Sequence, residues 1–177
     1  ELRQQGIDPY PPKFEVKNFS VELHEKYSTL KPETYTPDKV AIAGRLMSLR
    51  DLGKITFGVL QDSYGKIQIL LQDKETPHQT SDFFKKYIDI GDIIGIEGVI
   101  CKTKTGELSV LVKKVVILAK SILSLPEKWH GLQDEEERYR KRYLDLIVNS
   151  SVKDIFIKRA KILETIRQFM KKHNFIE

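Results

Sequence analysis

A regular alternation of apolar and polar positions begins at Val40 and is the strongest pattern along the chain. Apolar residues, many of them β-branched, recur at every second position, which is the period of a strand with one buried face. Turn-forming residues interrupt the pattern, and one interruption instead carries apolar residues at helical spacing over residues 80–88. The predicted strands cover residues 40–47, 55–61, 66–71, 93–101 and 107–118.

Three strands, one helix and then two strands is the element order of a five-stranded OB-fold barrel. Glycines inside the predicted strands fit this fold, because a small barrel needs sharp bends and close backbone approaches. They are Gly44, Gly58, Gly95 and Gly98. A different small Greek-key barrel is the alternative. The predicted fold class is therefore mainly β with helices (α+β).

Helical and irregular segments flank the predicted barrel. We predict an N-terminal arm with a short helix capped by Ser20 (residues 1–37), the barrel (38–120), a linker (121–133) and a helical region (134–177). The arm ends in a loop at residues 31–37. The last region begins with a charge-dense helix over residues 134–143 and continues with a long amphipathic helix capped by Ser150 or Ser151. Its apolar stripe comprises Ile155, Ile162, Leu163, Ile166, Phe169 and Met170.

The composition describes a globular protein, with 40% hydrophobic and 31% charged residues. A net charge of +5 allows a polyanionic partner without requiring one. No apolar run approaches the roughly 18–20 residues that span a bilayer, and no signal peptide is recognisable. The single cysteine, Cys101, excludes an internal disulfide and a cysteine-based zinc site; we expect it to be buried in a strand. A reducing, cytoplasmic setting fits.

The predicted barrel suggests where a ligand would bind, since OB-folds bind single-stranded nucleic acid on the face of strands two and three. Phe57 is a candidate stacking platform, and Gln68 can donate to and accept from a base edge. Arg50, with Lys54, precedes the second strand, and Glu107 opens the fifth. Ordinary structural roles remain open: Phe57 alternates with Ile55 and Val59 and fits a core position, and Gln68 and Glu107 fit solvated strand positions.

The spacing of Arg50, Phe57 and Gln68, followed by residues 102–109 (KTKTGELS), resembles the anticodon-binding domain of class II lysyl-tRNA synthetases. Residues 130–134 (HGLQD) and 137–146 (ERYRKRYLDL) resemble that family's passage into its catalytic domain. Residues 167–170 and 174–177 resemble the end of its motif 1 helix. The similarity runs along nearly the whole chain.

This resemblance implies that Phe57 stacks on the central uridine of a lysine anticodon, with Gln68 and Arg50 bonding its edge and Glu107 contacting a neighbouring base. It implies a parent enzyme that activates lysine with ATP and magnesium, esterifies the lysine tRNA and forms a homodimer through the long last helix. The chain lacks an initiator Met and the family's later motifs 2 and 3, so we expect a fragment without a catalytic residue or cofactor of its own. Lysine-dependent ATP–pyrophosphate exchange by these residues alone would contradict this expectation.

Other functions remain open at this point. The aspartate and asparagine enzymes of class II share the barrel and also read a central uridine, although residues 132–146 favour the lysine enzyme. A non-catalytic OB-fold module for single strands and a protein-binding scaffold are the others. We expect Trp129 to pack between domains, and the bases among residues 138–142 to pair within the protein rather than with RNA.

Overall fold

The computed structural model describes residues 2–126, 132 and 134–177. It divides into two compact units, Glu1–Ser124 and Leu125–Glu177. Trp129 and the predicted linker motif around His130 lie outside the described residues.

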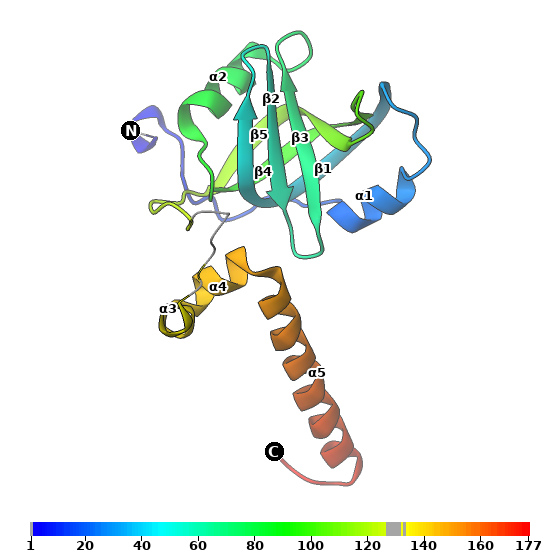
Figure 1. Cartoon of the computed structure of the whole chain (residues 1–177), viewed down its shortest axis with the longest axis vertical. Coiled ribbons are helices and arrows are strands. Elements are labelled where there is room, and N and C mark those ends of the chain that lie inside the picture. Colours follow the sequence, from blue (N-terminus) through cyan, green and yellow to red (C-terminus); the bar gives the residue numbers. More distant parts are fainter. Residues whose placement is uncertain (1, 127–131, 133) are drawn as a thin grey trace. The chain divides into compact units, whose positions relative to one another are not determined.

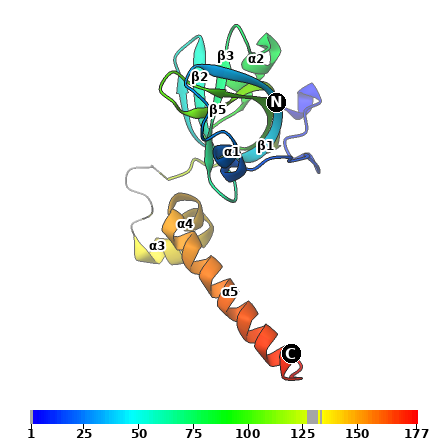
Figure 2. The same ribbon diagram turned by 90° about the vertical axis from the view of Figure 1, so that its right-hand side faces the viewer.

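The first unit is a closed barrel with the strand order β1-β2-β3-β5-β4. Its strands are β1 (Thr34–Asp51), β2 (Ile55–Gln61), β3 (Lys66–Gln72), β4 (Ile93–Lys102) and β5 (Leu108–Ala119). All neighbouring strands are antiparallel except β3 and β5, which are parallel. In both views the strands curve around a common interior (Figure 1, Figure 2). The predicted OB-fold architecture is confirmed.

The first strand is much longer than its alternation predicts. β1 begins at Thr34, inside the predicted loop, because Thr34 and Tyr35 pair with Lys102 and Cys101 of β4. The register shifts between Tyr35 and Lys39, around Pro37. Proline cannot donate to a ladder, so such an irregularity is expected there. A second shift at Leu46/Ser48 lets the same strand turn from β4 to β2.

The interior of the barrel is filled by aliphatic side chains from every strand. The fully buried ones include Ile42, Leu46, Leu60, Ile69, Ile94, Ile96, Ile100 and Val110. The glycines of the strands permit close approach, as predicted: a Cβ on Gly44 would lie 2.4 Å from the Gln61 carbonyl oxygen, and one on Gly98 would lie 2.3 Å from that of Leu111. Helix α2 (His78–Tyr87) adds the buried Phe84 to this core.

Helix α2 begins earlier than its sequence signals predict. The helical spacing begins at residue 80, and Thr80 and Ser81 are of the residue types that cap helices, but the helix starts at His78 with Pro77 at the cap position. Thr80 instead donates its hydroxyl to the Lys113 carbonyl oxygen at 3.1 Å, which joins the helix to β5. A long-range hydrogen bond therefore takes the side chain that the local pattern assigns to capping.

The short helix α1 (Ser20–Lys26) is held by the turn between β2 and β3. Ser20 is the first helical residue rather than the cap. Its backbone N–H and its hydroxyl donate to the Asp62 carboxylate at 2.6 and 2.8 Å. The N–H groups of Tyr64 and Gly65 donate to the same carboxylate at 2.8 and 2.7 Å. Burial tends to raise the pKa of Asp62, but these hydrogen bonds outweigh it and hold the pKa below its ordinary value of 3.8.

Asp62→Asn is expected to lower the free energy of unfolding by about 1 kcal/mol at neutral pH. This figure discounts the ~1.5–3 kcal/mol of a hydrogen bond to a charged group, because the carboxylate is only partly buried. A lowered native pKa stabilises the fold above the unfolded pKa, and this contribution disappears as pH falls through the native value. Urea unfolding of both proteins at neutral pH and near pH 3 measures the difference, which should shrink in acid. The exposed Asp73, changed to Asn, is the matched control; a difference that persists in acid would contradict the assignment.

The buried carboxylate of Asp92 links the start of β4 to the residues that follow β5. Asp92, fully buried just before β4, accepts from the N–H of Asp89 at 2.8 Å and from that of Ser121 at 2.7 Å. Lys120 Nζ lies 2.7 Å from Asp92 Oδ2 and 2.5 Å from Asp89 Oδ2. Burial tends to lower the pKa of Lys120, but the hydrogen bonds to both carboxylates raise it. The segment that follows β5 is thereby tied to the entrance of β4.

The second unit consists of α3 (Glu135–Arg140), α4 (Arg142–Val148) and α5 (Ser150–Lys172). The single helix predicted over residues 134–143 is broken at Lys141, whose φ and ψ are −112° and 51°. The break lets Arg138 and Arg142 reach the fully buried Asp145 from two helices. Burial tends to raise the pKa of Asp145, but hydrogen bonds from Asn149, Arg138 and Arg142 lower it. A tertiary ion cluster thus ends a helix that its local charge pattern would continue.

The basic residues of this region are paired within the protein, as predicted. Besides the two arginines on Asp145, Arg140 pairs with Glu136 at 2.6 Å and Lys141 pairs with Glu137 at 2.8 Å. The predicted apolar stripe lies exposed along α5, from Ile155 at 64% to Met170 at 39%. No helix in the described part of the chain is long and apolar enough to cross a membrane.

Candidate nucleic-acid interface

The direction of the Phe57 side chain follows from the alternation in β2. Thr56, Gly58 and Leu60 are buried, whereas Ile55, Phe57 and Val59 are only partly buried. Neighbouring strand residues point to opposite faces, so Phe57 lies on the outside of the barrel. The core position that its apolar neighbours also allowed is therefore wrong. The sequence left both faces open because both carry apolar residues.

Phe57 rests on a small second cluster outside the barrel. Leu70, Cys101 and Leu111 are buried there, and Ile55, Phe57 and Val99 pack against them. Packing against this cluster limits the movement of the partly exposed Phe57 ring, which is the property needed in a stacking platform. Cys101 is buried as predicted, and burial raises the pKa of its thiol to about 11. The thiol is thus neutral at physiological pH.

The strand register places two of the predicted residues, Arg50 and Gln68, beside this ring. Arg50 is directly opposite Phe57 on β1. On the other side Phe57 pairs with Leu70 and Val59 pairs with Gln68, so Gln68 is the diagonal neighbour of Phe57. Arg50 is exposed, and its side chain forms no ion pair or hydrogen bond with any residue the structure describes, whereas its backbone belongs to the β1–β2 ladder. A guanidinium and an amide therefore flank one partly exposed ring.

Glu107 lies farther along the same outer surface. A tight hairpin precedes β5, with Gly106 at a φ of 84° and the Thr103 N–H donating to the Glu107 carbonyl oxygen at 2.9 Å. Glu107 precedes Leu108 and faces the same side as Ser109. Since Ser109 pairs with Gln68, Glu107 lies beyond Gln68 as seen from Phe57. Its exposed carboxylate can accept a hydrogen bond from a base.

Ser109 is a site residue that the sequence reasoning missed. It is fully buried, and its hydroxyl lies 2.7 Å from Gln68 Oε1 and 3.3 Å from the Glu107 carbonyl oxygen. The contact joins residues 41 positions apart, through the parallel pairing of β3 with β5. Ser109 is within the segment that carries the family resemblance, but no local signal shows which strand it faces.

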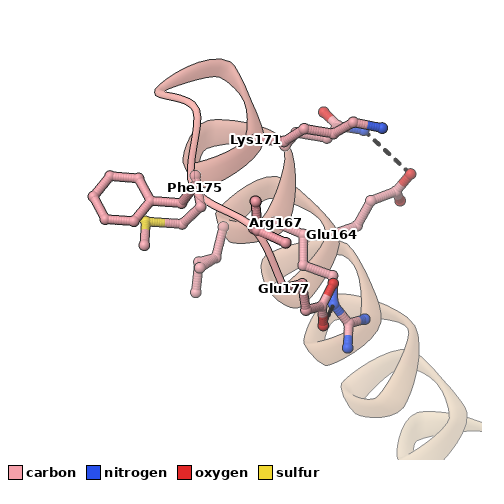
Figure 3. Close-up of a pocket in the computed structure, with 9 residues that line it drawn as sticks. Glu164, Arg167, Lys171, Phe175 and Glu177 are labelled. Atoms are coloured by element: carbon pink, nitrogen blue, oxygen red, sulfur yellow. Dashed lines mark hydrogen bonds and ion pairs between the residues drawn. The ribbon is translucent and has the colours of Figure 1, made fainter.

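Two hollows elsewhere contain none of the predicted site residues. One, about 480 Å³, lies over β1, β4 and β5 and includes four lysines, of which Lys113 pairs with Glu75 at 3.4 Å and Lys114 with Glu97 at 2.9 Å. The other, about 710 Å³, lies at the C-terminal end of α5. There Phe175 folds back beside the helix, and Arg167 reaches Glu177 at 2.7 Å (Figure 3). Its lining is mostly apolar.

The described residues contain no group of three or more His, Cys, Asp or Glu side chains arranged to hold a metal ion. His24, His78 and His173 belong to three different helical segments or helix ends, and His24 Nε2 lies 3.0 Å from the Lys66 carbonyl oxygen. What the outer face offers is a stacking ring with polar groups around it, an arrangement suited to binding bases.

Comparisons with known proteins match both parts of the chain. Residues 40–118 match the model of the OB-fold nucleic acid binding domain, and residues 134–177 match that of the tRNA synthetases of class II (D, K and N). The chain is 43% identical to the lysine–tRNA ligase of Thermotoga maritima over 100% of its own length, and 49% identical to that of Buchnera aphidicola over 99%. The chain is 46% identical to the lysine–tRNA ligase of Carboxydothermus hydrogenoformans over 100% of its own length. The chain spans about a third of the length of these relatives, 36%, 35% and 35% respectively.

Proposed function

The chain belongs to the family of class II lysine–tRNA ligases, and on this premise we propose that its barrel binds the anticodon loop of a lysine tRNA. The whole protein would then join lysine to that tRNA, using ATP and magnesium, in the cytoplasm. The observation that carries this proposal is the grouping of Arg50, Phe57 and Gln68 on the outer face of β1, β2 and β3.

The proposed roles follow from the chemistry of each side chain. Phe57 stacks on the central uridine, because an unpaired base presents a flat face that a fixed ring can cover. Arg50 and Gln68 bond the edge of this base. Glu107 accepts a hydrogen bond from an amino or imino group of a neighbouring base. Lys54, exposed in the turn before β2, remains a candidate for a phosphate contact.

The proposal also assigns roles to the other segments. Residues 38–120 form the anticodon-binding domain, after the arm of residues 1–37 and before a linker at 121–133, and residues 134–177 begin the catalytic domain. The exposed apolar stripe of α5 lies in a homodimer interface, which sedimentation of the whole protein can test. The catalytic residues and the sites for ATP and magnesium lie outside these residues.

The test is a comparison of RNA hairpins that share one stem and differ only in the loop. The chain is expected to bind a hairpin with the lysine anticodon UUU more tightly than hairpins with AAA or CCC, measured by fluorescence anisotropy. Hairpins with GUC and GUU, the aspartate and asparagine anticodons, separate the three class II alternatives. Equal affinity for all loops would instead favour a non-selective single-strand module.

A further inference from the structure

The buried hydroxyl of Ser109 lies directly behind Gln68 and has two oxygen neighbours. One is Gln68 Oε1 at 2.7 Å, and the other is the Glu107 carbonyl oxygen at 3.3 Å. A serine hydroxyl has a single proton, so it can donate fully to only one of them. The direction of this proton decides how the Gln68 amide is oriented, and the roles of Gln68 depend on that orientation.

The hairpin decides the direction of the proton. The Glu107 carbonyl oxygen already accepts from the Thr103 N–H at 2.9 Å and from the Thr103 hydroxyl at 3.2 Å. A carbonyl oxygen has two lone pairs, and these two donors occupy both when the Thr105 hydroxyl, 3.1 Å from that of Thr103, donates to Thr103 and leaves the Thr103 proton for Glu107. In addition, 2.7 Å is the usual length of an O–H···O bond and shorter than the usual 2.9–3.0 Å of an N–H···O bond. Ser109 therefore donates to Gln68, and the amide oxygen of Gln68 faces β5.

This orientation leaves the amide nitrogen of Gln68 as the group available to a ligand. Gln68 Nε2 donates to no residue among those the structure describes, and the side chain is partly exposed. The Arg50 guanidinium, across Phe57, has only donors. The groups that flank the Phe57 ring are consequently hydrogen-bond donors. They can bond a carbonyl oxygen of a base, but they cannot bond an amino group, which is itself a donor. Among pyrimidines, uracil has a carbonyl at ring position 4 and cytosine has an amino group there.

We propose that Ser109 is a positioning residue that fixes the Gln68 amide with its NH2 outward and thereby selects uracil over cytosine at the base stacked on Phe57. This inference rests on the proposed function, since it concerns the same base. It adds the source of the selectivity, which a glutamine alone lacks, because a free amide can rotate to present either its donor or its acceptor.

The test measures the ratio of two dissociation constants on one protein. Hairpins with a central U or a central C in an otherwise identical loop are titrated against the wild-type chain and against Ser109→Ala. The wild type is expected to favour U about tenfold or more, and Ser109→Ala is expected to reduce this ratio about fivefold or more, mainly by improved binding of C. A loss of folded protein lowers both affinities alike and leaves the ratio unchanged, so the ratio separates positioning from stability.

Ser48→Ala is the matched control. Ser48 is a partly exposed serine of β1 that pairs with Val59, and the substitution removes the same hydroxyl from the barrel without touching Gln68. It should leave the U-to-C ratio at the wild-type value. Gln68→Glu provides a second variant, because a carboxylate presents acceptors only. It is expected to shift the preference toward C, whose amino group can donate to it.

A double variant shows whether Ser109 acts through Gln68. In a Gln68→Ala background, Ser109→Ala should change the ratio no further. If the wild type prefers U and Phe57 matters, yet Ser109→Ala keeps the wild-type ratio, the positioning role is wrong and the proposed function stands. If the wild type does not distinguish the loops at all, the proposed function itself fails.

Discussion

Phe57→Ala is expected to weaken binding of the UUU hairpin about 5- to 150-fold, which corresponds to the ~1–3 kcal/mol of one base–aromatic stack. The ring is partly exposed, packs against the buried residues of the outer cluster and is flanked by Arg50 and Gln68. An alanine at this position leaves the base without a partner face, although the polar neighbours remain. The hairpin titration described above measures the loss directly.

Two further variants make the Phe57 result specific. Phe57→Tyr retains the ring and should bind within about threefold of the wild type, since either ring can stack on a base. Phe169→Ala removes an exposed phenyl group from α5 and should leave hairpin binding unchanged. Because Phe57 also covers Leu70 and Leu111, thermal unfolding of each variant must accompany the titration. Unchanged affinity in a folded Phe57→Ala protein would remove Phe57 from the site.

Asp92→Asn is expected to lower the free energy of unfolding by about 2–4 kcal/mol, the largest stability effect we predict. Breaking a buried charge pair typically costs ~3–5 kcal/mol, because it leaves a charge without its partner. The lower figure applies because Lys120 retains Asp89 at 2.5 Å. The amide oxygen can replace only one of the two carboxylate oxygens, so the NH2 faces donors: Lys120 and the Asp89 N–H in one orientation, or the Ser121 N–H in the other. Urea unfolding followed by circular dichroism measures the change.

Asp89→Asn is the matched control for Asp92. It alters the second carboxylate that contacts Lys120, but this side chain is 76% exposed. Exposed ion pairs contribute about 0–1 kcal/mol, so the expected loss is below about 1 kcal/mol. An equal loss in the two variants would show that burial of Asp92 is not the source of its effect.

Much of the barrel was predictable because its signals are local. The second strand was predicted with the bounds observed for β2, since alternation and the flanking turns define it. The order of three strands, a helix and two strands indicated the OB-fold, and Gly44 and Gly98 marked close backbone approaches. The family came from resemblance over nearly the whole chain. The predicted OB-fold put Arg50, Phe57, Gln68 and Glu107 forward as candidates, and the resemblance assigned their roles.

Long-range contacts decided what the sequence left open. β1 extends to Thr34 because β4 supplies hydrogen-bond partners there, and α3 ends at Arg140 because Arg138 and Arg142 converge on Asp145. In each place a partner distant along the chain, or in another helix, outweighs the local propensity.

The sequence by itself determined the barrel strands and their order, because spacing and turn chemistry act between near neighbours in the chain, and its resemblance to known synthetases indicated the family. Only the tertiary structure decided that Phe57 faces outward, because closure of the barrel selects one of two apolar faces of β2. It alone placed Ser109 behind Gln68, because the parallel pairing of β3 and β5 joins segments that no local pattern relates.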